Sequence, residues 1–268
     1  ERVTGIPARI WNRFEAIYRE DLARLAEKSK LEAQYGRAKL FPLKYLRDWK
    51  VITAASRDRA GTVRDLLALL GIGHLDAFDS TWVNAKVAYR KVPLGSDKTY
   101  EPATWLALGE REARAVELPV FDREDLESLI PELRALTVLS DPLIAIREAQ
   151  AKLREVGVAL CLVPPVPGAG LYGATRWIAG NPVIQLSMRG KSDDQLWFTL
   201  FHELGHVLLH GQKSVFLQGA ESPEEKEAHE FAARTLVPEG YADRLPTSRD
   251  IAAAERGRDH LSWPLALI

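Results

Sequence analysis

The sequence contains one cysteine, one methionine and no long apolar run among its 268 residues. The single Cys161 excludes an internal disulfide framework and favours a reducing compartment, so we expect a cytoplasmic protein. No apolar run reaches the length of a membrane span, so no membrane partner is expected. The charge is almost balanced, with 36 Lys+Arg against 37 Asp+Glu. This balance argues against a protein that coats nucleic acid along its whole length.

The residues that are present form an ordinary folding composition, 46% apolar and 27% charged. The length suffices for one large domain or two modest ones. The pattern changes along the chain and predicts an α+β protein with a helical segment 1–50, a mainly helical region 51–140 and a domain 141–268 that also contains strands. The chain begins at Glu1 and not at Met, so we expect the true N-terminus to be missing.

The first two segments are expected to be helical. Trp11, Phe14 and Tyr18 follow the i, i+3, i+7 spacing of one helix stripe, behind Pro7 as a helix opener. A charged stretch continues this helix until Pro42 breaks it. The residues from 95 to 102 look like a loop. Further helices are predicted at 62–71, 102–116, 122–136 and 141–156.

After Gly157 the pattern changes to strands followed by two helices. Strands are expected at 158–163, 173–178 and 183–188. A capping box at Ser192–Gln195 opens a long helix that ends at His210, and a second helix covers 223–236. The strand at 183–187 is a candidate for an exposed edge that holds a peptide in extended form.

The long helix carries His202-Glu203-Leu204-Gly205-His206. Histidines at i and i+4 share one helical face, where their imidazoles can bind one Zn²⁺, and Glu203 can reach a water on that metal. Two surface histidines beside a solvated glutamate would give the same letters. The helix is strongly apolar, however, and a buried helix would not place these polar groups in its apolar seam without partners.

A catalytic zinc needs a third protein ligand and one open position. The following helix offers Glu227 at the edge of the apolar face that contains Ala228 and Phe231. Glu225 and His229 form a competing i, i+4 pair, and an acidic run at a helix start also results from the helix dipole alone. The preferred metal set is therefore His202, His206 and Glu227, with Glu203 as the catalytic base.

The runs Phe201–His210, Glu225–Ala233 and Leu236-Val-Pro238 resemble the ImmA/IrrE family of metallopeptidases, as does the strand Tyr172–Trp177. The resemblance implies a zincin-like domain of small sheet, HExxH helix and ligand helix. It also implies that the ligand helix, of pattern E-x-E-A-N-x-F-A, supplies the acidic third ligand. His229 stands here where the family has Asn. The implied substrate is a specific regulatory protein, often a transcriptional repressor.

Residues 2–18 resemble the closing helix of an XRE-type helix-turn-helix domain, as found in HigA-type antitoxins fused to ImmA/IrrE domains. The resemblance places the recognition helix upstream, so we expect this chain to bind DNA weakly. The alternative is an ordinary amphipathic helix that packs on the middle region. Basic and aromatic residues alternate from Arg37 to Lys50, which suits either phosphate contacts or a solvated helical face.

Two functions therefore remain open. The first is a zinc-dependent endopeptidase domain of a cytoplasmic bacterial transcriptional regulator. The second is an antitoxin-like regulator whose zinc domain is a sensor or partner-binding module. A metal site closed by His229 would favour the second, and a groove along 183–187 the first. No oligomeric state follows, although a dimer is one candidate.

Residues from Thr247 depart from the family pattern, so His260 is not expected to bind metal. The candidates for stabilising an oxyanion at the metal site are Tyr172, Arg176, Arg189 and His210.

Overall fold

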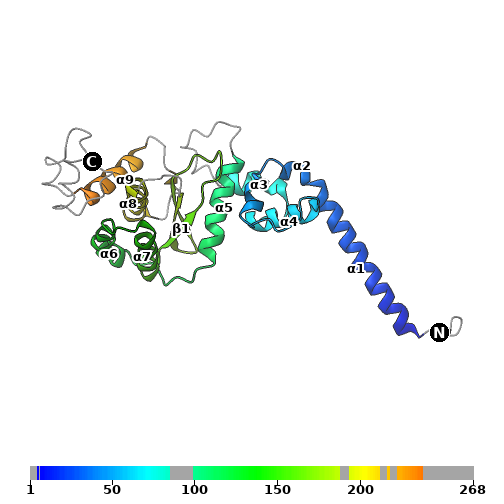
Figure 1. Ribbon diagram of the computed structural model, residues 1–268. Coiled ribbons are helices and arrows are strands. Elements are labelled where there is room, and N and C mark those ends of the chain that lie inside the picture. Colours follow the sequence, from blue (N-terminus) through cyan, green and yellow to red (C-terminus); the bar gives the residue numbers. More distant parts are fainter. Residues whose placement is uncertain are drawn as a thin grey trace. The chain divides into compact units, whose positions relative to one another are not determined.

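The computed structural model describes residue 5 and residues 7–84, 99–187, 193–211, 216–217 and 222–237. The chain forms two compact units, residues 1–81 and 82–268. The first is helical and the second combines helices with a small sheet, which confirms the predicted α+β class (Figure 1). In the described residues, no helix is both long enough and apolar enough to cross a membrane.

The first unit is built around α4 (Arg59–Leu70), whose ends follow from local sequence signals. Asp58 caps its first turn by accepting a hydrogen bond from the Gly61 amide, and Gly71 ends it with a φ of 64°. The core of the unit includes Phe78, which is fully buried. The other helices of this unit are α1 (Ala8–Ala33), α2 (Tyr35–Ala38), α3 (Leu43–Asp48) and the short 3-10 turn η1 (Leu75–Ala77). The π-helical segment η2 (Asp79–Asn84) spans the unit boundary.

The predicted aromatic stripe lies on α1 as expected, but it remains in solvent. Trp11, Phe14 and Tyr18 are each more than half exposed, and Leu31 is the only buried residue of the helix. In the basic stretch that follows, Arg37 forms ion pairs with Asp76 and Asp79 of the same unit. Its guanidinium charge is therefore already neutralised by two carboxylates.

The second unit opens with three helices that the sequence predicts closely, α5 (Tyr100–Arg114), α6 (Arg123–Leu136) and α7 (Pro142–Glu155). The side chains of Asp122 and Asp141 cap α6 and α7. Residues 95–98 of the expected loop lie outside the described residues, and its last three residues belong to α5, which begins at Tyr100. Pro102 fits its first turn, where a backbone N–H has no helical partner.

The sheet contains β1 (Ala159–Val163), β2 (Gly173–Ile178), β3 (Asn181–Ser187) and β4 (Phe216–Leu217), in the order β1-β3-β2-β4. β3 pairs antiparallel with β2 and parallel with β1, as in the pair Leu160↔Ile184. The expectation that 183–187 is an exposed edge is therefore wrong. The β2–β3 hairpin leaves one side of β3 open, and β1 occupies that side.

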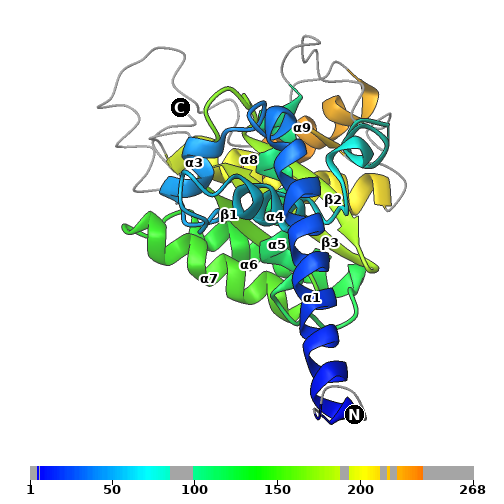
Figure 2. The same cartoon turned by 90° about the vertical axis from the view of Figure 1, so that its right-hand side faces the viewer.

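Helices cover both faces of the sheet. α5 contacts β1 and β3 on one face, while α7 and α8 (Asp193–His210) lie on the other (Figure 1). α6 and α7 lie side by side in both views (Figure 2). α9 (Pro223–Leu236) packs along α8, and Gly205 permits this close approach because a Cβ there would lie 3.1 Å from Ala228 Cα. The apolar core joins α6, α7, α8 and α9 to the sheet.

Candidate metal centre

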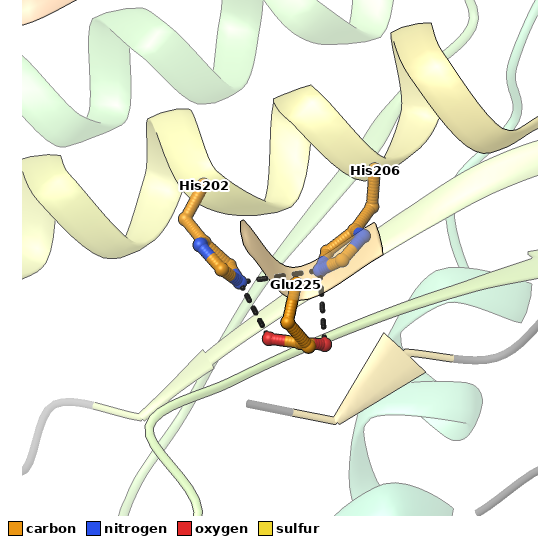
Figure 3. A group of neighbouring side chains, drawn as sticks. All are labelled: His202, His206 and Glu225. Atoms are coloured by element: carbon orange, nitrogen blue, oxygen red, sulfur yellow. Dashed lines mark hydrogen bonds and ion pairs between the residues drawn. The ribbon is translucent and has the colours of Figure 1, made fainter. Parts of the chain in front are cut away.

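The histidine pair of α8 is buried and points to one place. His202 and His206 are 3% and 1% exposed, and their Nε2 atoms lie 3.1 Å apart (Figure 3). The i, i+4 spacing places the two rings on the face of α8 that meets α9, where they meet edge to face with their centroids 4.8 Å apart. The packing around α8 therefore holds the two Nε2 atoms next to each other, on the side of α8 that faces α9.

The first turn of α9 brings a carboxylate to this pair. Glu225 places Oε2 3.1 Å from His202 Nε2 and Oε1 3.2 Å from His206 Nε2 (Figure 3). One ligand atom from each of the three residues lies within 4.8 Å of the others. The helix start is fixed locally, since Ser222 accepts a hydrogen bond from the Glu225 amide and Pro223 follows it. The cap therefore fixes the backbone of Glu225, while the two histidines contact its carboxylate.

Glu227, the preferred third ligand of the sequence analysis, is not at this point. Its side chain is 60% exposed, against 12% for Glu225, and its Oε2 lies 3.0 Å from His210 Nε2. Helix periodicity explains the difference. At about 100° per residue, Glu225 lies about 20° from the centre of the arc marked by the buried Ala228, Ala232 and Leu236, whereas Glu227 lies about 140° away. Phe231, which served in the sequence to place Glu227 at the apolar face, is only partly buried.

His229, the other alternative, also stays outside the group. Its ring packs edge-on against Phe198 at 4.8 Å, and its centroid lies 6.4 Å from that of His202. Among the described residues, the only group of three or more His, Cys, Asp or Glu side chains placed to hold a metal is His202, His206 and Glu225. The part of the chain that the structure describes therefore offers no fourth side chain of the kind that would close the site.

Glu203 is fully buried beside the histidines, on the side of the sheet. Its Oε2 accepts a 2.6 Å hydrogen bond from the Thr175 hydroxyl on β2, while Oε1 has no hydrogen-bond partner among the described residues. Gly173 makes room for it, because a Cβ there would collide with Oε1. The sequence motifs do not mark Thr175, because its place beside Glu203 depends on the packing of α8 against β2 and on the pairing of Thr175 with the core residue Ile184.

Burial and mutual contacts set the charges of the group. Burial raises the pKa of Glu203 to about 8, against the opposing effects of His202 and the Thr175 hydrogen bond. Burial also raises the pKa of Glu225, but hydrogen bonds from both histidines outweigh it and bring the value down to about 2. Burial lowers the pKa of His206. Burial also acts to lower the pKa of His202, but the hydrogen bond to Glu225 and the nearby carboxylates outweigh it, so the pKa of His202 rises. Glu225 is consequently ionised at neutral pH.

The residues expected to flank the metal site and stabilise an oxyanion lie in different places in the structure. Arg176 lies on the opposite face of the sheet, where it donates to the Leu106 carbonyl and pairs with Glu110, so the expectation of a role at the metal is wrong for it. Tyr172 precedes β2 and is partly exposed. Arg189 and His260 lie outside the described residues. His210 sits behind His206 and does not face Glu225.

Residues 156–265 match the family model of the IrrE N-terminal-like domain, a peptidase family. The match begins at the end of α7 and includes the sheet, α8 and α9. This part of the chain is therefore a metallopeptidase-like domain, and the three converging side chains lie inside it. No curated protein matches the chain.

Proposed function

We propose that His202 and His206, through Nε2, and Glu225, through its carboxylate, bind one Zn²⁺ in a site that hydrolyses peptide bonds. The observation that carries the proposal is the convergence of two buried histidines and the largely buried Glu225 next to Glu203. Two imidazole nitrogens and one carboxylate form a donor set that suits zinc. Three protein ligands also leave one position for a water or a substrate, as catalytic zinc sites require.

Bound zinc would polarise the scissile carbonyl and make a water more acidic. The chain's own contribution is proton transfer by Glu203. Thr175 fixes one of its oxygens. The other, Oε1, has no hydrogen-bond partner among the described residues; it accepts the proton of the attacking water and then delivers it to the leaving amine. Burial raises the pKa of Glu203 to about 8 in the metal-free chain, and the positive charge of a bound zinc ion would lower it, so that the ionised carboxylate is available to accept the proton.

The substrate class follows from the family resemblance and not from the geometry. We propose a specific regulatory protein as substrate, within a bacterial transcriptional regulator whose DNA-reading helices precede this chain. The competing proposal is an antitoxin-like regulator with a zinc sensor. It predicts that zinc is bound without hydrolysis and that His229 is a fourth ligand. The contact of the His229 ring with Phe198 does not favour that role.

The test compares the wild type with Glu203→Gln, which keeps the size of the side chain but cannot accept the proton. Both proteins are loaded with zinc and incubated with a bacterial protein extract, which contains regulatory proteins, and new termini are read by mass spectrometry. We expect equal zinc content and a loss of cleavage by about 10²–10⁴-fold in the variant. Equal cleavage by both proteins would contradict the mechanism. Zinc binding without new termini in either protein would favour the sensor.

A further inference from the structure

The outward side of His206 begins a chain of hydrogen bonds that the proposed zinc site does not use. His206 Nδ1 lies 3.0 Å from Nδ1 of His210, one turn further along α8. Nε2 of His210 lies 3.0 Å from Oε2 of Glu227 on α9. The His210 side chain is 9% exposed, so this contact is shielded on one side and open to solvent at the carboxylate.

The chemistry of these groups assigns the protons along the chain. An ionised carboxylate only accepts hydrogen bonds, so His210 donates to Glu227 from Nε2. Neutral His210 then carries a lone pair on Nδ1, and His206 must donate to it from its own Nδ1. That tautomer leaves the lone pair of His206 on Nε2, the atom that faces Glu225. The opposite assignment would place a proton where a metal ligand needs a lone pair.

We propose that Glu227 and His210 form a positioning pair that holds His206 in the Nδ1–H tautomer and in the orientation that binds zinc. The inference rests on the proposed metal site. The two hydrogen bonds link the pair to the site through His206, the member that supplies a ligand atom. His202 has no equivalent support, since its buried Nδ1 has no hydrogen-bond partner among the described residues. The pair thus orders one of the two imidazoles.

The measurement is the zinc dissociation constant of the full chain in competition with a chromogenic chelator. Groups that orient a metal-binding histidine typically contribute about 10–100-fold in affinity, so we expect a loss of this size for His210→Ala. Glu227→Ala should weaken binding in the same direction. Glu227→Gln keeps an acceptor oxygen for His210 and should therefore retain most of the zinc affinity that Glu227→Ala loses. The matched control is Glu230→Ala, which removes an exposed carboxylate from the same helix and should leave zinc affinity unchanged.

The double variant His210→Ala/Glu227→Ala separates positioning from general stabilisation. If Glu227 acts only through His210, the double variant binds zinc as weakly as His210→Ala alone. A merely structural role would give additive losses that follow the melting temperature of the metal-free protein. The exposed position of Glu227 keeps the test valid even if His210→Ala does not fold.

The outcomes distinguish this inference from the function on which it rests. A wild type that takes up no zinc removes the metal site, and this inference with it. A wild type that binds zinc with the same affinity as Glu227→Ala and His210→Ala overturns the positioning pair alone. Complete loss of zinc in Glu227→Ala, with binding retained in Glu225→Ala, would also overturn it by making Glu227 the ligand.

Discussion

At the scale of single residues, the two glutamates beside the histidines respond to burial in opposite ways. Glu225 meets two imidazoles and stays ionised, with a pKa of about 2. Glu203 has one hydrogen-bonded oxygen and a pKa of about 8, because burial dominates its surroundings. One carboxylate is therefore fixed as a charged ligand, whereas the other gains and loses a proton near neutral pH, as general acid–base chemistry requires.

This difference predicts a pH dependence of the metal-free protein. The pKa of Glu203 is raised from 4.5, so folding favours its protonated form. The resulting stability is fully present below pH 4.5 and is lost as the pH rises to about 8. A tenfold change in proton affinity corresponds to about 1.4 kcal/mol, so the loss amounts to roughly a few kcal/mol. Urea unfolding with chelator at pH 6 and pH 9 measures it.

Glu203→Gln is the control for that experiment, because it removes this titration and leaves those of the histidines. We expect the variant to lose less stability than the wild type between the two pH values. A wild type and a variant with parallel pH profiles would show that Glu203 is not held in its protonated form. Glu225 does not interfere, since its lowered pKa contributes stability that is lost only as the pH falls below 4.5 toward about 2.

The third ligand is tested by metal content. Glu225→Ala leaves two imidazoles, which hold zinc poorly, so we expect the zinc content to fall from about one per chain to near zero after dialysis. Glu227→Ala should retain zinc under the same conditions, with lower affinity. Elemental analysis of both variants decides the assignment. Loss of metal in Glu227→Ala only would return the ligand to the residue that the sequence analysis preferred.

The sequence alone indicates the histidine pair and the base, because a short pattern on one apolar helix carries both. The choice between Glu225 and Glu227 depends on which apolar residues of α9 define its buried face. Ala228, Ala232 and Leu236 define it, whereas the larger Phe231 does not. Thr175 depends on strand pairing and on the packing of α8 across the sheet, so no local pattern reveals it.

At the scale of elements, local signals and long-range pairing differ in how well they can be read. α4, α6 and α7 carry their own caps and stops, and their predicted ends agree with the structure within a few residues. The position of β3 depends on which strand takes its free side, and that strand, β1, comes earlier in the chain. An apolar run of this kind suits a central strand as well as an edge strand next to a cleft.

The contact between β2 and α8 gives a prediction of its own. A Cβ on Gly173 would collide with Glu203 and lie 2.7 Å from Thr199 Cγ2. Gly173→Ala must therefore displace the side chains that an added Cβ would meet, those of Glu203 and Thr199. We expect a loss of stability of about 1–3 kcal/mol. Zinc content should persist, while cleavage of proteins in a bacterial extract should fall.

Gly36→Ala is the matched control for Gly173→Ala. A Cβ at this position in α2 meets nothing within 4 Å, so neither stability nor cleavage should fall. Zinc content, urea unfolding and cleavage are measured on both variants. Full activity of Gly173→Ala at wild-type stability would mean that Glu203 does not occupy the space next to Gly173.

At the scale of the whole molecule, the site and its supporting core belong to one compact unit. His202, His206 and Glu225 lie in the unit 82–268, as does the match to the IrrE N-terminal-like domain. The core cluster from Leu126 to Leu236 lies there too. The first unit has a core of its own around α4. All three ligand side chains of the proposed site therefore come from the second unit.

We accordingly predict that residues 82–268, produced without the first unit, fold and bind zinc with the affinity of the full chain. A ligand that binds only the folded state stabilises it by about 2.7 kcal/mol at a concentration 100-fold above its dissociation constant. Zinc should therefore raise the melting temperature of the truncated protein, and His206→Ala in the same truncated protein should abolish the increase. Circular dichroism establishes folding, and chelator competition gives the affinity. A folded truncated protein without zinc uptake, beside a full chain that binds it, would show that the first unit is needed to form the site.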